Sequence, residues 1–96
     1  MPITNKQDTT MEEIYISFKE ISDGGVVILR EITPFANLED AKRSLQAYYE
    51  DELYYAKKQG HIIDDRMGDE LPYYESHDES EYGTFSVCYV TKQTIR

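Results

Sequence analysis

Residues 14–32 read IYISFKEISDGGVVILREI, and this stretch predicts a β-hairpin. Its first half places Ile14, Ile16 and Phe18 in alternation with polar side chains, which is the period of a half-buried strand. An Asp-Gly pair between two apolar runs is a strong signal for a tight turn, and Asp23-Gly24 supplies that pair. The alternation puts Tyr15 on the face away from Ile14 and Ile16, where we expect it to be exposed.

The return strand, predicted over residues 26–32, begins with four apolar residues. We therefore expect one of its faces to pack on a core and the other to be covered as well. Residues 33–36, TPFA, are expected to end this strand, because proline cannot donate a hydrogen bond to a neighbouring strand.

A long amphipathic helix is predicted from Leu38 to Gln59, with Asn37 as its N-cap and Gly60 just beyond its end. Its first turn is acidic and its last turn carries lysines, and the helix dipole favours both. Glu52 falls within the apolar stripe of this helix. We expect it at the rim, where it reaches water or a hydrogen-bond partner; the alternative is a carboxylate of raised pKa poised for chemistry.

The rest of the chain predicts a weak edge strand over residues 71–75 and a clear strand over 84–91. The resulting ββαββ order predicts an α+β, two-layer domain: an antiparallel sheet of three to four strands with one long helix packed on one face. We expect a flexible arm at residues 1–11, a single domain at 12–92 that contains an acidic connector at 64–82, and a C-terminal tail at 93–96.

The negative charge of the chain is concentrated in residues 64–82. A single cation, Arg66, stands there against eight carboxylates: Asp64, Asp65, Asp69, Glu70, Glu75, Asp78, Glu79 and Glu81. The segment has a formal charge of −7, whereas the whole chain of 96 residues has −9. A localised field of this sign favours a basic protein partner and disfavours direct contact with nucleic acid or an anionic membrane.

No catalytic residue, metal site or cofactor is predicted. Cys88 lies within a predicted strand, where a cysteine usually packs as a small apolar residue. A calcium loop that starts at Asp78 fails, because Tyr89 occupies the position that needs a bidentate glutamate. His61 and His77 lack the spacing of a zinc site. A metal-dependent hydrolase built on the paired aspartates of the acidic segment remains a less favoured alternative.

Tyrosines lie among these carboxylates, and exposed tyrosines are enriched at protein interfaces. In the predicted helix, Tyr54 lies opposite the apolar stripe and should face solvent. We therefore expect a partner-binding surface that combines acids with tyrosines. Its candidate residues are Asp64, Asp65, Asp69, Glu70, Tyr73, Tyr74, Glu75, Asp78, Glu79, Glu81, Tyr82 and Tyr54.

In size, acidity and tyrosine content the chain resembles the small acidic inhibitors that bacteriophages encode, including anti-CRISPR proteins and other DNA mimics. That resemblance implies an inhibitor whose carboxylates occupy a basic, nucleic-acid-binding site on a partner protein. The chain departs from this pattern at Arg43, Lys57 and Lys58, which put positive charge on the outer face of the helix.

The alternative is a homo-oligomeric scaffold domain, such as a homodimer, that associates through exposed tyrosines. A cytoplasmic location is expected for either function. The lone cysteine allows no intramolecular disulfide, and the sequence shows no signal peptide and no membrane-spanning stretch.

Overall fold

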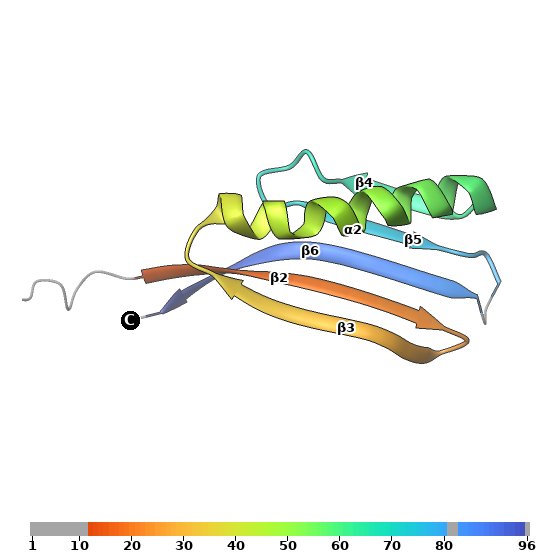
Figure 1. The fold of residues 1–96 in the computed structure, drawn as a ribbon, viewed down its shortest axis with the longest axis horizontal. Coiled ribbons are helices and arrows are strands. Elements are labelled where there is room, and N and C mark those ends of the chain that lie inside the picture. The colour runs from red at the N-terminus through yellow and green to blue at the C-terminus, as the bar shows by residue number, and fades with distance from the viewer. Residues whose placement is uncertain (1–11, 81–82, 96) are drawn as a thin grey trace, which may run out of the picture.

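The structure, a computed structural model, describes residues 12–80 and 83–95. The described chain forms five strands and one helix (Figure 1). In chain order these elements are β2 (Glu12–Asp23), β3 (Val26–Phe35), α2 (Leu38–Gln59), β4 (Ile62–Arg66), β5 (Tyr73–His77) and β6 (Thr84–Ile95).

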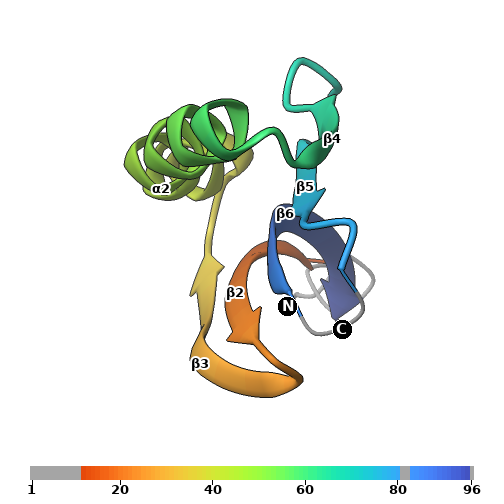
Figure 2. The same cartoon turned by 90° about the vertical axis from the view of Figure 1, so that its right-hand side faces the viewer.

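The strands form one antiparallel sheet in the order β3-β2-β6-β5-β4. In the end-on view of Figure 2, α2 lies on one side of the curved sheet, and no described helix or strand covers the other side. The α+β class is therefore confirmed. The expected count of three to four strands and the ββαββ order are wrong, because the acidic segment contributes two short strands instead of one.

The first hairpin is confirmed, since β2 pairs with β3 around Gly24 and Gly25. Both glycines have positive φ, at 60° and 84°, a conformation that glycine adopts without steric cost. The expected break at residues 33–36 is wrong, because β3 continues through Pro34 to Phe35. This strand lies at the edge of the sheet, where a proline can be accommodated without removing a ladder hydrogen bond.

Both predicted ends of the helix are confirmed. The Asn37 side chain accepts a hydrogen bond from the Asp40 backbone N–H at 2.9 Å, which satisfies one of the free donors of the first turn. Gly60 ends the helix at φ 72°, and its N–H donates to carbonyl groups of the last turn. These ends depend on local chemistry alone, which is why the sequence specifies them.

The helix covers the face of β2 that the sequence pattern assigns to solvent. The core comprises Ala41, Leu45, Tyr74, Cys88 and Val90. Ser17 is 2% exposed and pairs with Val90, so it shares this covered face. Tyr15 packs half-buried against the core, and the prediction that it is exposed is wrong.

Hydrogen bonds stabilise this more polar interface between helix and sheet. The Tyr48 hydroxyl donates to the Glu20 carbonyl at 3.0 Å and lies 2.7 Å from Ser86 Oγ. Burial raises the pKa of Tyr48, and the nearby Glu52 carboxylate adds to this rise. Glu52 itself is half-buried, in agreement with a position at the rim of the core.

Two of the expected boundaries also differ from the structure. Residues 93–95 belong to β6 and pair with β2, so they are not a tail. The segment 64–82 is not a simple connector, because most of it folds into β4, β5 and the turn between them. The weak strand predicted at 71–75 is found at Tyr73–His77 and is internal, with β4 as the edge strand. The expected arm at residues 1–11 lies outside the described residues.

Within the described part of the chain, α2 is the one helix, and its sequence is too polar to cross a membrane.

Candidate functional site

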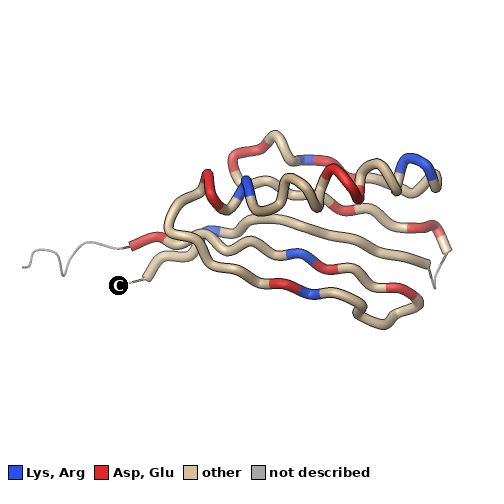
Figure 3. The backbone as a smooth tube through the Cα atoms, viewed as in Figure 1, with Lys and Arg blue, Asp and Glu red and all other residues tan. Residues whose placement is uncertain are grey.

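The acidic segment forms the hairpin at the free edge of the sheet opposite β3. Between Ile62 and Ser80 this hairpin contains seven carboxylates and one cation, Arg66. Figure 3 shows that the carboxylates follow the hairpin from one of its ends to the other. The sequence predicted these acids as a group, and the structure adds that they belong to an ordered edge of the sheet.

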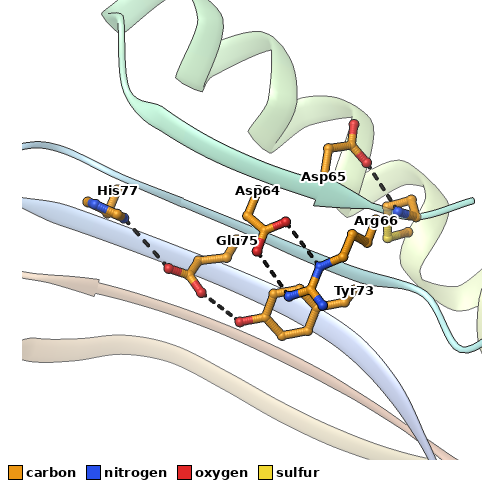
Figure 4. Close-up of polar contacts among 7 residues, drawn as sticks. Asp64, Asp65, Arg66, Tyr73, Glu75 and His77 are labelled. Carbon is orange, nitrogen blue, oxygen red and sulfur yellow. Dashed lines mark hydrogen bonds and ion pairs between the residues drawn. The ribbon is translucent and has the colours of Figure 1, made fainter. Parts of the chain in front are cut away.

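In the middle of the hairpin, Asp64 on β4 pairs directly with Glu75 on β5. Arg66 binds Asp64 through two hydrogen bonds, of 3.1 Å from Nε and 2.9 Å from Nη2 (Figure 4). The Tyr73 hydroxyl donates to Glu75 at 2.6 Å, and His77 Nδ1 lies 3.6 Å from the same carboxylate. The hydrogen bond to Glu75 raises the pKa of Tyr73 to about 12, so this hydroxyl remains a donor at neutral pH.

Asp65 points to the opposite face of the hairpin, toward the helix. It accepts a hydrogen bond from the Tyr49 hydroxyl at 2.7 Å and another from the Met67 backbone N–H at 3.1 Å. The first of these bonds raises the pKa of Tyr49 to about 12. Asp65 therefore fixes the hairpin to α2 and to its own turn.

The ends of the hairpin carry four further carboxylates. Asp69 and Glu70 lie exposed in the β4–β5 connection, and the half-buried Asp78 and the exposed Glu79 follow β5 at the other end. Asp78 accepts a hydrogen bond from the Ser80 backbone N–H at 2.9 Å, which orders that turn. Among the described residues, no ion pair involves any of these four carboxylates.

Three of the predicted tyrosines are described, and the structure separates them. Tyr74 is 0% exposed in the core under α2, so the prediction that it contacts a partner is wrong. Tyr54 is 67% exposed on the outer face of the helix, remote from the sheet core, as expected. Tyr73 is half-buried on the other face of the sheet. The predicted residues Glu81 and Tyr82 lie outside the described residues.

The Tyr74 hydroxyl is an unusual feature of the core. It is buried, and no described group lies in ordinary hydrogen-bonding geometry with it, although Ser76 is close enough to oppose the rise in its pKa. Burial is the main cause of that rise. Burial also raises the pKa of the neighbouring Cys88 thiol to about 12, so this cysteine is held as the unreactive neutral form.

A row of aromatic side chains crosses the uncovered face of the sheet, and the sequence did not reveal it. The Phe18 and Tyr89 rings stack with centroids 4.9 Å apart, and the Tyr89 and Tyr73 rings stack at 5.8 Å. The Arg66 guanidinium lies 4.6 Å from the centroid of the Tyr73 ring. Alternation along each strand predicts which residues share a face. Only the register between neighbouring strands places these aromatic residues opposite one another.

Within residues 12–80 and 83–95, no three side chains of His, Cys, Asp or Glu converge as a metal-binding group. The hairpin carboxylates are instead paired along the strands or separated at the two turns. The site therefore presents an ordered electrostatic surface, and its described residues do not form a donor set for a metal-dependent hydrolase.

Comparisons with models of known protein families, with curated proteins and with solved structures found no match to this chain.

Proposed function

We propose that this protein is an inhibitor that binds a partner protein through the β4–β5 hairpin and occupies a basic site that otherwise holds nucleic acid. The observation that carries this proposal is the charge of the hairpin, with seven carboxylates and a single arginine on an exposed edge of the sheet. A nucleic-acid site presents lysines and arginines to phosphates. Carboxylates form charge-assisted hydrogen bonds with the same groups.

The spacing of the charges fits an extended basic groove better than a point contact. Asp69 and Glu70 are separated from Asp78 and Glu79 by the length of β5, which is about 17 Å for five residues. Phosphates along one DNA strand rise by about 3.4 Å each, so this length corresponds to about five phosphate positions. The hairpin can therefore meet several cations of one groove at the same time.

The hairpin is also pre-organised for binding. Its inner strand β5 is paired with β6, and Asp65 on β4 is hydrogen-bonded to Tyr49 on the helix. A binding surface that is ordered in advance loses less conformational entropy when the complex forms. A cytoplasmic location is part of the proposal, because nucleic-acid-binding enzymes are found there and the lone buried Cys88 needs no oxidising compartment.

The test is affinity capture from a lysate of the native host with three forms of the protein. The first is the wild type, and the second neutralises the hairpin ends by Asp69→Asn, Glu70→Gln, Asp78→Asn and Glu79→Gln. The third is a matched control that removes four exposed charges elsewhere, by Asp23→Asn, Glu39→Gln, Glu50→Gln and Asp51→Asn. We expect the wild type and the control to retain a basic, nucleic-acid-binding protein that the hairpin variant loses.

Two further readouts decide the mode of binding. The retained protein should elute with rising salt, because the contacts are ionic, and duplex DNA should displace the inhibitor from it. The proposal fails if the hairpin variant captures the same protein as well as the wild type does. It also fails if duplex DNA leaves the complex intact.

A further inference from the structure

Along β2, the uncovered face of the sheet is more apolar than the face under the helix. On β2, the side chains of Ile14, Ile16 and Phe18 lie on the uncovered face, whereas Ser17 and Lys19 lie beneath α2. A lone two-layer domain normally shows the reverse pattern, with the apolar face of its antiparallel sheet covered. The part of the uncovered face around β2 therefore has the composition of a surface that is buried in a complex.

The row of rings lies on β2, β6 and β5, and one further residue at each end extends it to the two edges of the sheet. Ile32, Phe18, Tyr89, Tyr73 and Arg66 occupy directly paired positions on β3, β2, β6, β5 and β4 in turn. Ile32 at one end of the row is 61% exposed. The row therefore presents a continuous apolar band from the centre of the sheet to its β3 edge.

The rings of this band are stacked on one another. The planes of neighbouring rings are inclined by 20° and 18°, with centroids 4.9 and 5.8 Å apart, so each ring turns a face toward the next ring. The Arg66 guanidinium lies over the ring at the end of the row, 4.6 Å from its centroid. A nucleobase binds aromatic platforms by stacking on free ring faces, and these contacts occupy part of the ring faces. The band therefore fits another layer of side chains better than a flat ligand.

The charged groups that flank the row are already paired within the chain. Arg30 Nε lies 2.9 Å from Glu20, Arg66 binds Asp64, and Glu75 is held by the Tyr73 hydroxyl and His77. With the histidines counted as neutral, two cations and three carboxylates flank the row, so the excess charge of the face there is the single negative charge of Glu75. A second copy of the same face keeps these internal pairs and meets little repulsion over the row.

From these observations we infer that the protein forms a homodimer in which two uncovered sheet faces pack against each other. The strands contain 44 residues. At about 3.4 Å per residue and 4.8 Å between strands, one face covers about 700 Å². A stable interface buries roughly 600–1,000 Å² per partner, so the face is large enough. The two sheets pack as the layers of a β-sandwich, with an acidic hairpin at an edge of each copy.

The mass in solution tests this inference, measured by sedimentation equilibrium over a range of protein concentrations. The wild type is expected at twice the chain mass of 11.2 kDa. Ile32→Lys should raise the dimer dissociation constant by about tenfold or more, because it places a charge in the apolar interface. Thr91→Lys, on the same face of β6 opposite Ile16, should have the same effect.

Thr33→Lys is the matched control, because Thr33 is the exposed neighbour of Ile32 on the same strand and points to the helix side. It should leave the dimer intact. A monomeric wild type at every concentration overturns the inference. The inference is also overturned if Ile32→Lys and Thr33→Lys weaken the dimer equally. That result would assign the contact between the two copies to the β3 edge instead of the sheet face.

Salt separates this inference from the proposed function. Added salt screens the repulsion between two chains of charge −9, so it should leave the dimer unchanged or strengthen it. The hairpin-end variant that abolishes capture of a basic partner should still form the dimer. Loss of the dimer in that variant, with a monomeric mass, would contradict the assignment to the sheet face.

Discussion

Asp64 and Glu75 stand directly opposite each other in the β4–β5 ladder, so two carboxylates face one another across a pair of strands. Like charges in this arrangement destabilise a sheet. The structure compensates for the repulsion within the same face: Arg66 binds Asp64, and the Tyr73 hydroxyl donates to Glu75. The acidic hairpin is therefore held in its folded form by a small number of neutralising contacts.

Arg66→Gln is expected to lower the stability of the protein, because it leaves the two opposed carboxylates without a cation. The loss should be greater at low salt than at high salt, since salt screens the repulsion. Urea unfolding at two ionic strengths measures it. The matched control is Arg43→Gln, which removes the guanidinium that pairs with Asp40 on the helix surface. If the Arg66 variant is as stable as this control at low salt, Arg66 does not compensate for the repulsion between Asp64 and Glu75.

Leu45→Ala is expected to destabilise the fold by about 2–5 kcal/mol, because it opens a cavity in the core between helix and sheet. Leu45 is 0% exposed and packs in the core cluster with Tyr74 and Cys88. Tyr54→Ala on the exposed side of the same helix should change stability by no more than about 0.5 kcal/mol. The free energy of unfolding in urea gives both values, and similar costs for the two variants would refute the observed packing of α2.

Alkaline pH should destabilise the protein through Cys88. Burial raises the pKa of this thiol to about 12 in the folded chain, against roughly 8.5 in an unfolded chain. The folded state therefore favours the neutral thiol. This contribution is complete below about pH 8.5 and is lost as the pH rises toward about 12.

We expect the urea midpoint of the wild type to fall more steeply between about pH 8 and pH 11 than the midpoint of Cys88→Ala. Most of this range lies between the pKa of the thiol in an unfolded chain, roughly 8.5, and its pKa in the folded chain, about 12. The native thiol should also react with a thiol reagent only as fast as the protein opens. Rapid labelling of the folded protein at neutral pH would show that Cys88 is accessible.

Gly60→Ala is expected to cost about 1 kcal/mol, because Gly60 has φ 72° and residues with a Cβ are strained there. An added Cβ would meet no atom within 4 Å, so the cost comes from the backbone alone. Gly68→Ala tests this reason, since Gly68 also has open space around it but is outside the left-handed region. It should be neutral or slightly stabilising. Equal thermal stability of the two variants would contradict the helix end described above.

The sequence predicted much of the candidate site and little of its geometry. The excess of acids between Asp64 and Glu79 is visible without a structure. Its division into two strands was partly missed, because β4 and β5 are short and carry few of the branched apolar residues that mark strands. The sequence predicts a partner contact for both Tyr73 and Tyr74, and only the tertiary structure places Tyr73 on the open face and Tyr74 in the core.

The amino-acid sequence by itself determined the elements whose signals are local. The glycines at 24 and 25 form the first turn, and Asn37 and Gly60 bound the helix, because capping and positive φ act within a few residues. Only the tertiary structure decided which face of the sheet the helix covers. Alternation along a strand shows which residues share a face, but it does not show which of the two faces packs against the helix. The hydrogen bonds of Tyr48 and Tyr49 to distant strands favour the more polar face, and they leave Phe18 and Tyr89 uncovered.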